Sequence, residues 1–481
     1  MPLRGALRRP YGEARSLSLI TRIMTSVNIT IESMTRQGSI SSVFGAYLYA
    51  ALLVAGPWIF TVLGLFFLSA AACDGSCPDL TIFRSIIIYN SMYALIITSP
   101  LAFFSGRYVS EQLHRGCNDS VFYALVLSLL IFALLSIGLA VPFYFWATTL
   151  NATERIASIY NIVMIGCAWL IIPFIGALRA YNAVLVAFGA AGLSMLVLGC
   201  MLHDPSATSL LLAFNGSFAI ANSILLATVV LRFGTEITID SLLTNGLRRT
   251  WELPAAGMAY ALGLWVDKII MWYSAPSGGL IVAGALHTMP SYDTAMFWSQ
   301  LSSIPVIAVF FVHVETRFSA LIQKFHARLQ QRASLRELNE IIRKIATHVL
   351  SNLVGLFAAL VIVAGMMILL SFVFMTQLGL RPAYMVVLRV SLCSMTFYTS
   401  AMFCFNFLLH LDLRRPALLI VLTYLGLNSV LTLAFLSFGP DLYGYGNLVA
   451  SAVSLLVGLG LLLKELPWLH YHAFIINNAS L

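Results

Sequence analysis

The chain has 481 residues, of which 60% are hydrophobic and only 10% are charged. Soluble domains are about 45–50% apolar and about 25% charged, and the mean hydropathy of +0.91 departs from them in the same direction. One soluble core cannot bury so many apolar residues, so a bilayer must cover the rest. A net charge of +8 and a pI near 9.2 would suit a nucleic-acid-binding protein, unless the basic residues gather on one membrane face.

Twelve stretches are long and apolar enough to cross the hydrocarbon core of a bilayer as helices, which takes about 20 residues each. They cover residues 46–72, 83–104, 120–148, 157–178, 181–202, 208–231, 254–274, 294–314, 346–374, 384–410, 416–438 and 446–463. The sequence therefore predicts an all-α integral membrane protein with about 12 transmembrane helices.

Lysine and arginine are distributed unevenly between the two sides of these spans. With the N-terminus placed in the cytoplasm, 22 of the 27 basic residues fall on the cytoplasmic side and three fall outside, while Lys268 and Arg389 lie within spans. This bias is the positive-inside signature of membrane proteins. It predicts a multi-pass protein of the bacterial inner membrane with both termini in the cytoplasm. It also explains the basic pI without nucleic acid.

The spans divide as six plus six. The predicted parts are a cytoplasmic N-terminal tail (1–45), an N-lobe with helices 1–6 (46–231), a cytoplasmic linker (232–253), a C-lobe with helices 7–12 (254–464) and a C-terminal tail (465–481). The first 23 residues lack the apolar core and cleavage site of a signal peptide. They are either a solvated tail or follow an upstream start that the cell does not use, with Met24 and Met34 as alternative starts.

Proline and glycine interrupt corresponding spans of the two halves. The first span of each half carries "AGPW" (55–58) or "LPAAG" (253–257), and the second spans carry Pro100 and Pro305. Matched breaks in two halves indicate transporter repeats with a binding site between them, although proline and glycine are common in membrane helices in general.

The longest cytoplasmic loop covers residues 315–345. Its apolar residues recur at the three-to-four spacing of a helix, and basic residues fill the other face. The apolar positions are Phe318, Leu321, Ile322, Phe325 and Leu329. The pattern predicts an amphipathic helix, which either lies on anionic lipid or offers a docking surface to a cytoplasmic partner.

Catalytic features are missing from the sequence. No soluble segment exceeds about thirty residues, and no G-x-x-x-x-G-K-[ST] phosphate loop occurs. His313 and His348 are single histidines near span ends and are interpreted as structural. We therefore expect a transporter rather than an enzyme, with no cofactor or metal. Cys73 and Cys77 share the first outside loop and could form a disulfide in an oxidising periplasm.

An acidic and a basic residue, Asp267 and Lys268, stand together inside the apolar run "GLWVDKIIMW" (263–272). Asp267 lies thirteen residues past Pro254, about 20 Å along a helix, in the outer half of the bilayer. Its side chain is short, and an ionised Asp there costs a few kcal/mol, so it needs a partner or a wet cavity. Lys268 could instead snorkel outward beside Trp272, which is expected in the aromatic belt.

Neighbouring residues point about 100° apart on a helix, so Asp267 and Lys268 need not bridge each other. Arg389 in the tenth span is a candidate counter-ion for Asp267. The pattern leaves two interpretations open, namely cavity charges on a substrate path and a purely structural pair. Asp293 and Glu315, at the two ends of the eighth span, are further candidates for the path.

Three segments resemble one known family: "YALGLWVDKIIMW" (260–272), "YDTAMFWSQLSSIPVIAVFFVHVETRF" (292–318) and the first-span "AGPW". They are similar to the PelG family of exopolysaccharide exporters, in the multidrug/oligosaccharidyl-lipid/polysaccharide flippase superfamily. The resemblance runs from about residue 29 across nearly the whole chain. Family members tend to begin with a Gly-Ile-Gly-Phe-Glu-Leu-Arg-like run, where this chain reads "NITIESMTR" (28–36), a departure that bears on the true start.

The resemblance implies twelve helices in two pseudo-symmetric six-helix lobes around a central cavity. It implies export of a growing polymer rich in N-acetylgalactosamine, made by a cytoplasmic glycosyltransferase during biofilm matrix production. It also implies a membrane-bound cyclic-di-GMP receptor and a scaffold protein as partners, for which the 315–345 loop is a reasonable docking surface.

The sequence leaves open two alternatives from other functional classes. The first is a cation- or proton-driven flippase of the same fold that moves drugs or lipid-linked oligosaccharides. The second is a non-transporting scaffold that anchors a synthase.

Overall fold

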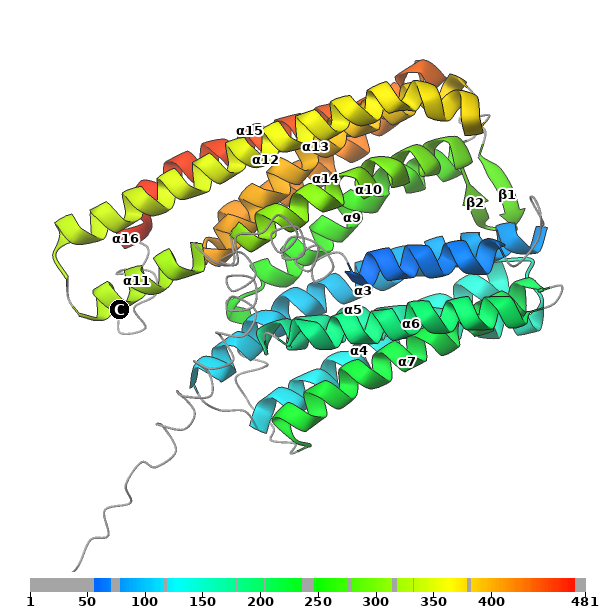
Figure 1. The fold of residues 1–481 in the computed structure, drawn as a ribbon, viewed down its shortest axis with the longest axis horizontal. Coiled ribbons are helices and arrows are strands. Elements are labelled where there is room, and N and C mark those ends of the chain that lie inside the picture. Colours follow the sequence, from blue (N-terminus) through cyan, green and yellow to red (C-terminus); the bar gives the residue numbers. More distant parts are fainter. Residues whose placement is uncertain are drawn as a thin grey trace, which may run out of the picture.

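A computed structural model describes most of the chain as long helices gathered into two groups (Figure 1). The described residues are 56–70, 78–115, 119–178, 180–202, 205–235, 246, 248–274, 279–313, 318–331, 333–378 and 382–471. The first 55 residues, the loop that holds Cys73 and Cys77, and Glu315 therefore lie outside the described part.

The N-lobe contains a helix over Gly56–Ala70 and five labelled helical segments. These are α3 (Pro78–Arg115), α4 (Asp119–Pro142) with its π-helical continuation η1 (Phe143–Ala147), α5 (Ala152–Ala177), α6 (Tyr181–Met201) and α7 (Ala207–Phe233). Within this lobe α5 is central, because it packs against α3, α4, α6 and α7.

The C-lobe contains six long helices and several short elements. The long helices are α9 (Glu252–Tyr273), α10 (Pro290–His313), α12 (Leu335–Leu378), α13 (Pro382–His410), α14 (Arg414–Leu436) and α15 (Tyr445–Glu465). The short elements are β1 (Leu280–Ala283), β2 (Leu286–Thr288), α11 (Ser319–Gln330), η4 (Pro440–Leu442), η5 (Leu466–Trp468) and α16 (Leu469–Tyr471). Helix α13 packs against α10, α12, α14 and α15.

Each of the twelve predicted spans falls on one helix of the described residues, which confirms the predicted fold class. Ten of these helices are long and apolar enough to cross a membrane. The other two are the Gly56–Ala70 helix, which is apolar but short as described, and α10, which carries Asp293, Gln300 and four serines. Large apolar side chains remain exposed on the bundle, among them Leu231 and Leu369, as expected of a surface that lipid covers.

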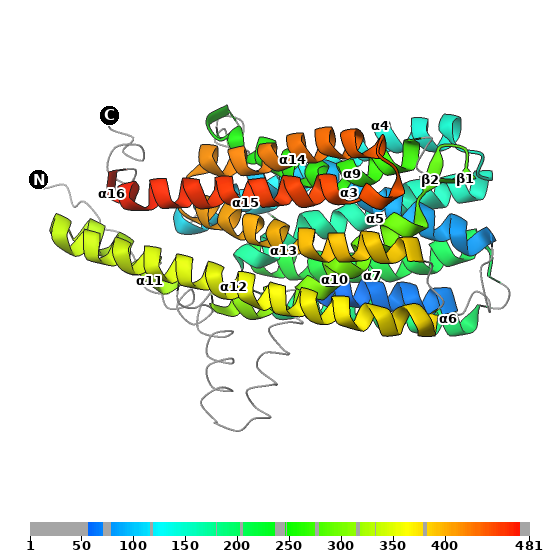
Figure 2. The same cartoon turned by 90° about the horizontal axis from the view of Figure 1, so that it is seen from above.

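The two ends of the bundle differ. Strands β1 and β2 form an antiparallel hairpin at one end, which we call the hairpin end, and α11 lies at the other, the α11 end (Figures 1 and 2). The scan for apolar runs misses the hairpin because its strands have only four and three residues. Gly284 turns the hairpin with φ +62°, a conformation that L-residues with a side chain rarely adopt.

The predicted amphipathic segment forms α11 and the start of α12. With 44 residues, α12 is about 66 Å long at 1.5 Å per residue, about twice the thickness of the hydrocarbon core. It therefore extends past the membrane at the α11 end. Phe318 and Phe325 are buried, and the Phe318 ring lies 4.8 Å from the Phe407 ring of α13. The apolar face of α11 is thus covered by protein, which does not fit a helix that lays this face on lipid.

Candidate functional site

The two lobes meet where α3 of the N-lobe packs against α9 of the C-lobe. At the hairpin end the Tyr89 ring stacks on the Trp272 indole, with centroids 4.7 Å apart and planes at 20°. The Tyr89 hydroxyl donates to the His287 carbonyl oxygen at 2.9 Å and accepts from the His287 amide at 3.0 Å. Trp272 is only 1% exposed, so it closes this end and is not an aromatic-belt residue.

The hairpin also reaches the N-lobe through its backbone. The Ala285 amide donates to the Ala147 carbonyl oxygen at 2.8 Å, where η1 ends. A β-carbon on Gly284 would lie 2.6 Å from the same oxygen, so only glycine allows this approach. The hairpin therefore ties the C-lobe to the N-lobe.

A second set of contacts joins the lobes toward the α11 end. The Phe103 ring of α3 lies 6.3 Å from Tyr260 and 5.9 Å from Phe405. Beyond these rings an Arg107 Nη2 lies 3.3 Å from Asp412 Oδ2. The described lobes are thus in contact at both ends of their interface.

Asp267 and Lys268 both face the interior of the C-lobe. Asp267 is fully buried and Lys268 is 6% exposed. The Lys268 ammonium donates to Asp267 Oδ1 at 3.2 Å, to Asp267 Oδ2 at 3.3 Å and to the Leu264 carbonyl oxygen at 2.9 Å. The alternative interpretation of Lys268 as a snorkelling anchor is therefore wrong, because its flexible four-carbon stem folds back onto the carboxylate despite the angle between neighbouring positions.

Polar side chains from other helices complete this arrangement, which we call the C-lobe network: Asp267, Lys268, Tyr292, Asn447, Tyr424 and Ser394. The Tyr292 hydroxyl donates to Asp267 Oδ2 at 2.7 Å, and Asn447 Nδ2 donates to the same oxygen at 3.3 Å. Asn447 Oδ1 in turn accepts from Tyr424 and Ser394. The buried carboxylate thus accepts four hydrogen bonds from three side chains on three helices, α9, α10 and α15.

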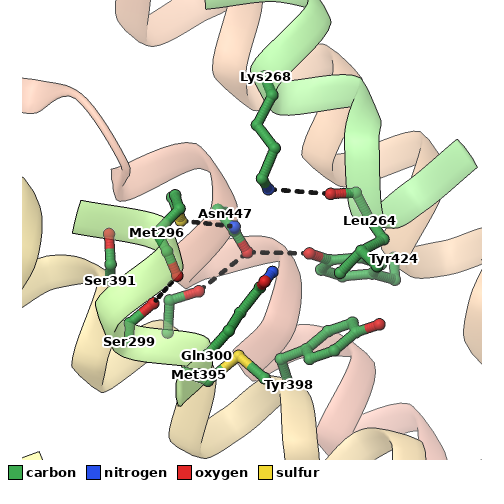
Figure 3. Close-up of a pocket in the computed structure, with 11 residues that line it drawn as sticks. Leu264, Lys268, Met296, Ser299, Gln300, Ser391, Met395, Tyr398, Tyr424 and Asn447 are labelled. Atoms are coloured by element: carbon green, nitrogen blue, oxygen red, sulfur yellow. Dashed lines mark hydrogen bonds between the residues drawn. The ribbon is translucent and has the colours of Figure 1, made fainter. Parts of the chain in front are cut away.

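A small cavity lined by polar and apolar side chains adjoins the C-lobe network (Figure 3). It measures about 10 Å³, close to the minimum that holds one water molecule. Lys268 and Asn447 line it together with Ser391, whose buried hydroxyl has no hydrogen-bond partner among the described residues. A cavity of this size admits water or a small ion and excludes a sugar.

The other predicted site residues lie apart from this network. The Arg389 guanidinium lies over the Phe372 ring at 4.5 Å, and in the described part of the chain no ion pair joins it to Asp267. Asp293 accepts from the Trp272 indole at 2.9 Å and from the Met289 amide at 3.0 Å. Asp293 therefore caps α10 and fixes Trp272 at the lobe interface.

The N-lobe holds a polar network without charges. Asn90 donates to Asn161, which donates to Asn215, and Tyr144 donates to Asn90. All four side chains are at most 1% exposed. Sequence reasoning missed these residues and Asn447, although a polar residue inside an apolar span was the available signal.

Two six-helix lobes with polar networks inside them, and with apolar side chains on the outside, define a multi-pass membrane protein. Residues 24–474 match the PelG exopolysaccharide exporter (EPS-E) family, and the chain belongs to this family. No curated protein matches it.

Solved structures show the same fold at low sequence identity. An outward-facing multidrug resistance MATE family transporter of the MOP superfamily superposes with a TM-score of 0.65 at 11% identity, over 88% of this chain and 96% of that chain. A MOP superfamily transporter from Pyrococcus furiosus gives a TM-score of 0.61 at 10% identity, over 88% and 95%. An inward-facing MATE structure gives 0.57 at 11% identity, over 88% and 99%. At these identities the likeness establishes the fold alone.

Proposed function

We propose that this chain carries a growing exopolysaccharide, Pel-like and rich in N-acetylgalactosamine, from a cytoplasmic glycosyltransferase to the periplasm during biofilm matrix production. Membership of the exporter family over residues 24–474 carries this proposal. The interface between the lobes would supply the route, because α3 and α9 meet along it from the Tyr89–Trp272 stack at the hairpin end to the Phe103 and Tyr260 rings toward the α11 end.

The positions of the basic side chains support an orientation of the chain in the inner membrane. At the α11 end lie Arg107, Arg232, Arg248, Arg249, Lys324, Arg328, Arg336, Arg343, Lys344, Arg414, Arg415 and Lys464, against Arg84 and Arg155 at the hairpin end. The positive-inside rule supports a cytoplasmic α11 end and a periplasmic hairpin. The exposed basic side of α11 and of the start of α12 would then face the glycosyltransferase, the cyclic-di-GMP receptor and the scaffold protein.

The hairpin end suits a largely neutral sugar polymer. Tyr93, Phe143, Tyr89 and Trp272 form a continuous aromatic series there, with centroids 4.7–5.8 Å apart. Aromatic rings offer an apolar face, and tyrosine and tryptophan add a polar handle. When the lobes separate, these faces would become available to sugar rings. Asp267 and Lys268 would lie behind this path as a neutral pair.

A reversible cross-link between the lobes tests the proposal. The variant Ala147→Cys/Ala285→Cys, in a background without native cysteines that still secretes, ties the hairpin to η1 at the site of the 2.8 Å backbone bond. Oxidation should abolish polymer secretion, and a reductant should restore it. The matched control Thr153→Cys/Thr208→Cys joins two N-lobe helices at the same end, where the hydroxyls are 3.5 Å apart, and should secrete under both conditions.

Other outcomes would favour the alternatives. Unchanged secretion after complete Ala147–Ala285 cross-linking would overturn the proposed route and favour a scaffold. Transport of a discrete lipid-linked oligosaccharide by the purified chain, without a synthase, would favour a flippase.

A further inference from the structure

The Lys268 ammonium occupies a position built from oxygen atoms. Three oxygens surround it at 2.9–3.3 Å, namely the Leu264 carbonyl and both carboxylate oxygens of Asp267. Hard cations in proteins are bound by such carbonyl and carboxylate oxygens. The distances exceed the 2.3–2.6 Å typical of calcium, so the position fits a larger monovalent ion such as ammonium or potassium.

The local charge balance depends on Lys268 alone. Besides Lys268, the donors to the Asp267 carboxylate are the neutral Tyr292 hydroxyl and Asn447 amide. In the described part of the chain no other cationic side chain pairs with Asp267, since Arg389 lies over Phe372. Without the ammonium, a fully buried carboxylate would therefore keep an uncompensated negative charge, which is strongly unfavourable.

Space for a free ion exists once the lysine stem is removed. The water-sized cavity is lined by Lys268 itself and by Leu264, Asn447 and Ser391. The Ser391 hydroxyl is 1% exposed and unpaired among the described residues, so the wall of this cavity carries an oxygen atom with no hydrogen-bond partner there. Truncation of Lys268 would merge the volume of its stem with this cavity, next to the Leu264 carbonyl.

We propose that Lys268 is a tethered cation that permanently fills a monovalent-cation site in the C-lobe. The C-lobe carboxylate is therefore closed to free sodium, potassium or ammonium, and transport does not draw on a cation gradient at Asp267. This inference is independent of the exported substrate. It separates the chain from a flippase that would couple transport to cation binding at this carboxylate.

Thermal unfolding of the purified protein in different salts tests the proposal. The melting temperature of the unmodified chain should be the same in choline, sodium, potassium and ammonium chloride at equal ionic strength. Lys268→Ala should melt lower in choline. It should regain about 2–4 °C once ammonium or potassium exceeds its dissociation constant about a hundredfold.

Two control variants complete the design. Lys268→Met fills the stem volume with an uncharged chain and should not respond to cations. The double variant Asp267→Asn/Lys268→Ala lacks the carboxylate and should not respond either, which links any rescue to Asp267.

Three results would overturn the proposal. The first is a specific stabilisation of the unmodified chain by sodium, potassium or ammonium over choline. The second is a folded Lys268→Ala that responds to none of these ions. The third is a Lys268→Ala that fails to accumulate in cells, where potassium is abundant, while Asp267→Asn/Lys268→Ala accumulates normally, because an open site would have taken up the available ion.

Discussion

Gly257 lets the backbones of α9 and α3 touch, and its replacement by alanine should loosen the lobe interface toward the α11 end. A β-carbon at Gly257 would lie 2.6 Å from the Ser99 carbonyl oxygen and 3.1 Å from the Pro100 nitrogen. These are backbone atoms that cannot rotate away, so α3 must move. Overpacking of this kind costs about 1–3 kcal/mol, and the gain from Gly→Ala in a helix offsets about 0.4–1 kcal/mol. A net cost of about 1–2 kcal/mol lowers the equilibrium constant for closing this contact by a factor of about 5–30.

The shift can be measured with a thiol cross-linking reporter across the same end of the interface. Arg107 and Asp412 lie on opposite lobes with their charged groups 3.3 Å apart, so Arg107→Cys/Asp412→Cys should be joined quickly by a bifunctional thiol reagent about as long as the arginine side chain when the lobes are closed. Adding Gly257→Ala should slow the cross-linking, by up to the factor of about 5–30 by which it shifts the contact. Gly365→Ala is the matched control, because no atom lies within 4 Å of the added β-carbon. Equal rates with Gly257 and Gly257→Ala would refute the assignment of this contact.

Two further substitutions test the C-lobe network and the hairpin. Tyr292→Phe removes a 2.7 Å hydrogen bond to a buried carboxylate and should lower stability by about 1.5–3 kcal/mol, against about 0.5–1.5 kcal/mol for Tyr424→Phe, which loses a neutral bond. Equal losses in thermal unfolding would contradict the role of Asp267 as a charged acceptor. Gly284→Val should detach the hairpin from Ala147 and slow the Ala147→Cys/Ala285→Cys cross-link. Gly439 also has a positive φ, +96°, but no atom lies within 4 Å of an added β-carbon, so Gly439→Val should not slow it.

The membrane-crossing helices could be predicted because hydropathy over about twenty residues reports directly on burial in lipid. The helix ends could not be predicted in the same way. Helix α3 covers Pro78–Arg115 and α12 covers Leu335–Leu378, where the apolar runs are 83–104 and 346–374. The additional turns are polar and lie where water or other protein segments, rather than lipid, surround them, so an apolar-run scan does not detect them.

The charged pair was recognisable from the sequence because charges are rare in apolar spans, whereas its partners were not. Tyr292 and Asn447 lie 25 and 180 positions from Asp267, and only the packing of α9, α10 and α15 brings them together. Arg389, by contrast, was predicted as a partner of Asp267 and is not one in the described part of the chain. It has the expected charge and lies within a span, but it faces Phe372 on α12, because the direction of a side chain on α13 depends on packing that the sequence alone does not reveal.

The proline and glycine residues that interrupt the spans also shape the contact between the two lobes. Pro254 lies in the first turn of α9, where proline is tolerated. Gly257, from the same "LPAAG" segment, approaches Pro100 on α3. Gly257 of the C-lobe and Pro100 of the N-lobe, which interrupt spans in different halves of the sequence, thus meet across the lobe interface. The close approach depends on backbone shape, so small side chains at this point decide how tightly the lobes close.

Contacts within the lobes differ in kind from contacts between them, and this difference determines how the protein can move. Each lobe is held together by fully buried polar networks, around Asn161 in one and Asp267 in the other, where a lost partner is costly. Between the lobes, the Arg107–Asp412 pair is partly exposed and contributes only about 0–1 kcal/mol. At the hairpin end the lobes are joined by the Ala285–Ala147 backbone bond, by two hydrogen bonds between Tyr89 and His287, and by the Tyr89–Trp272 stack. Opening the interface breaks these contacts and leaves the buried networks inside each lobe intact, so the lobes should move as rigid bodies.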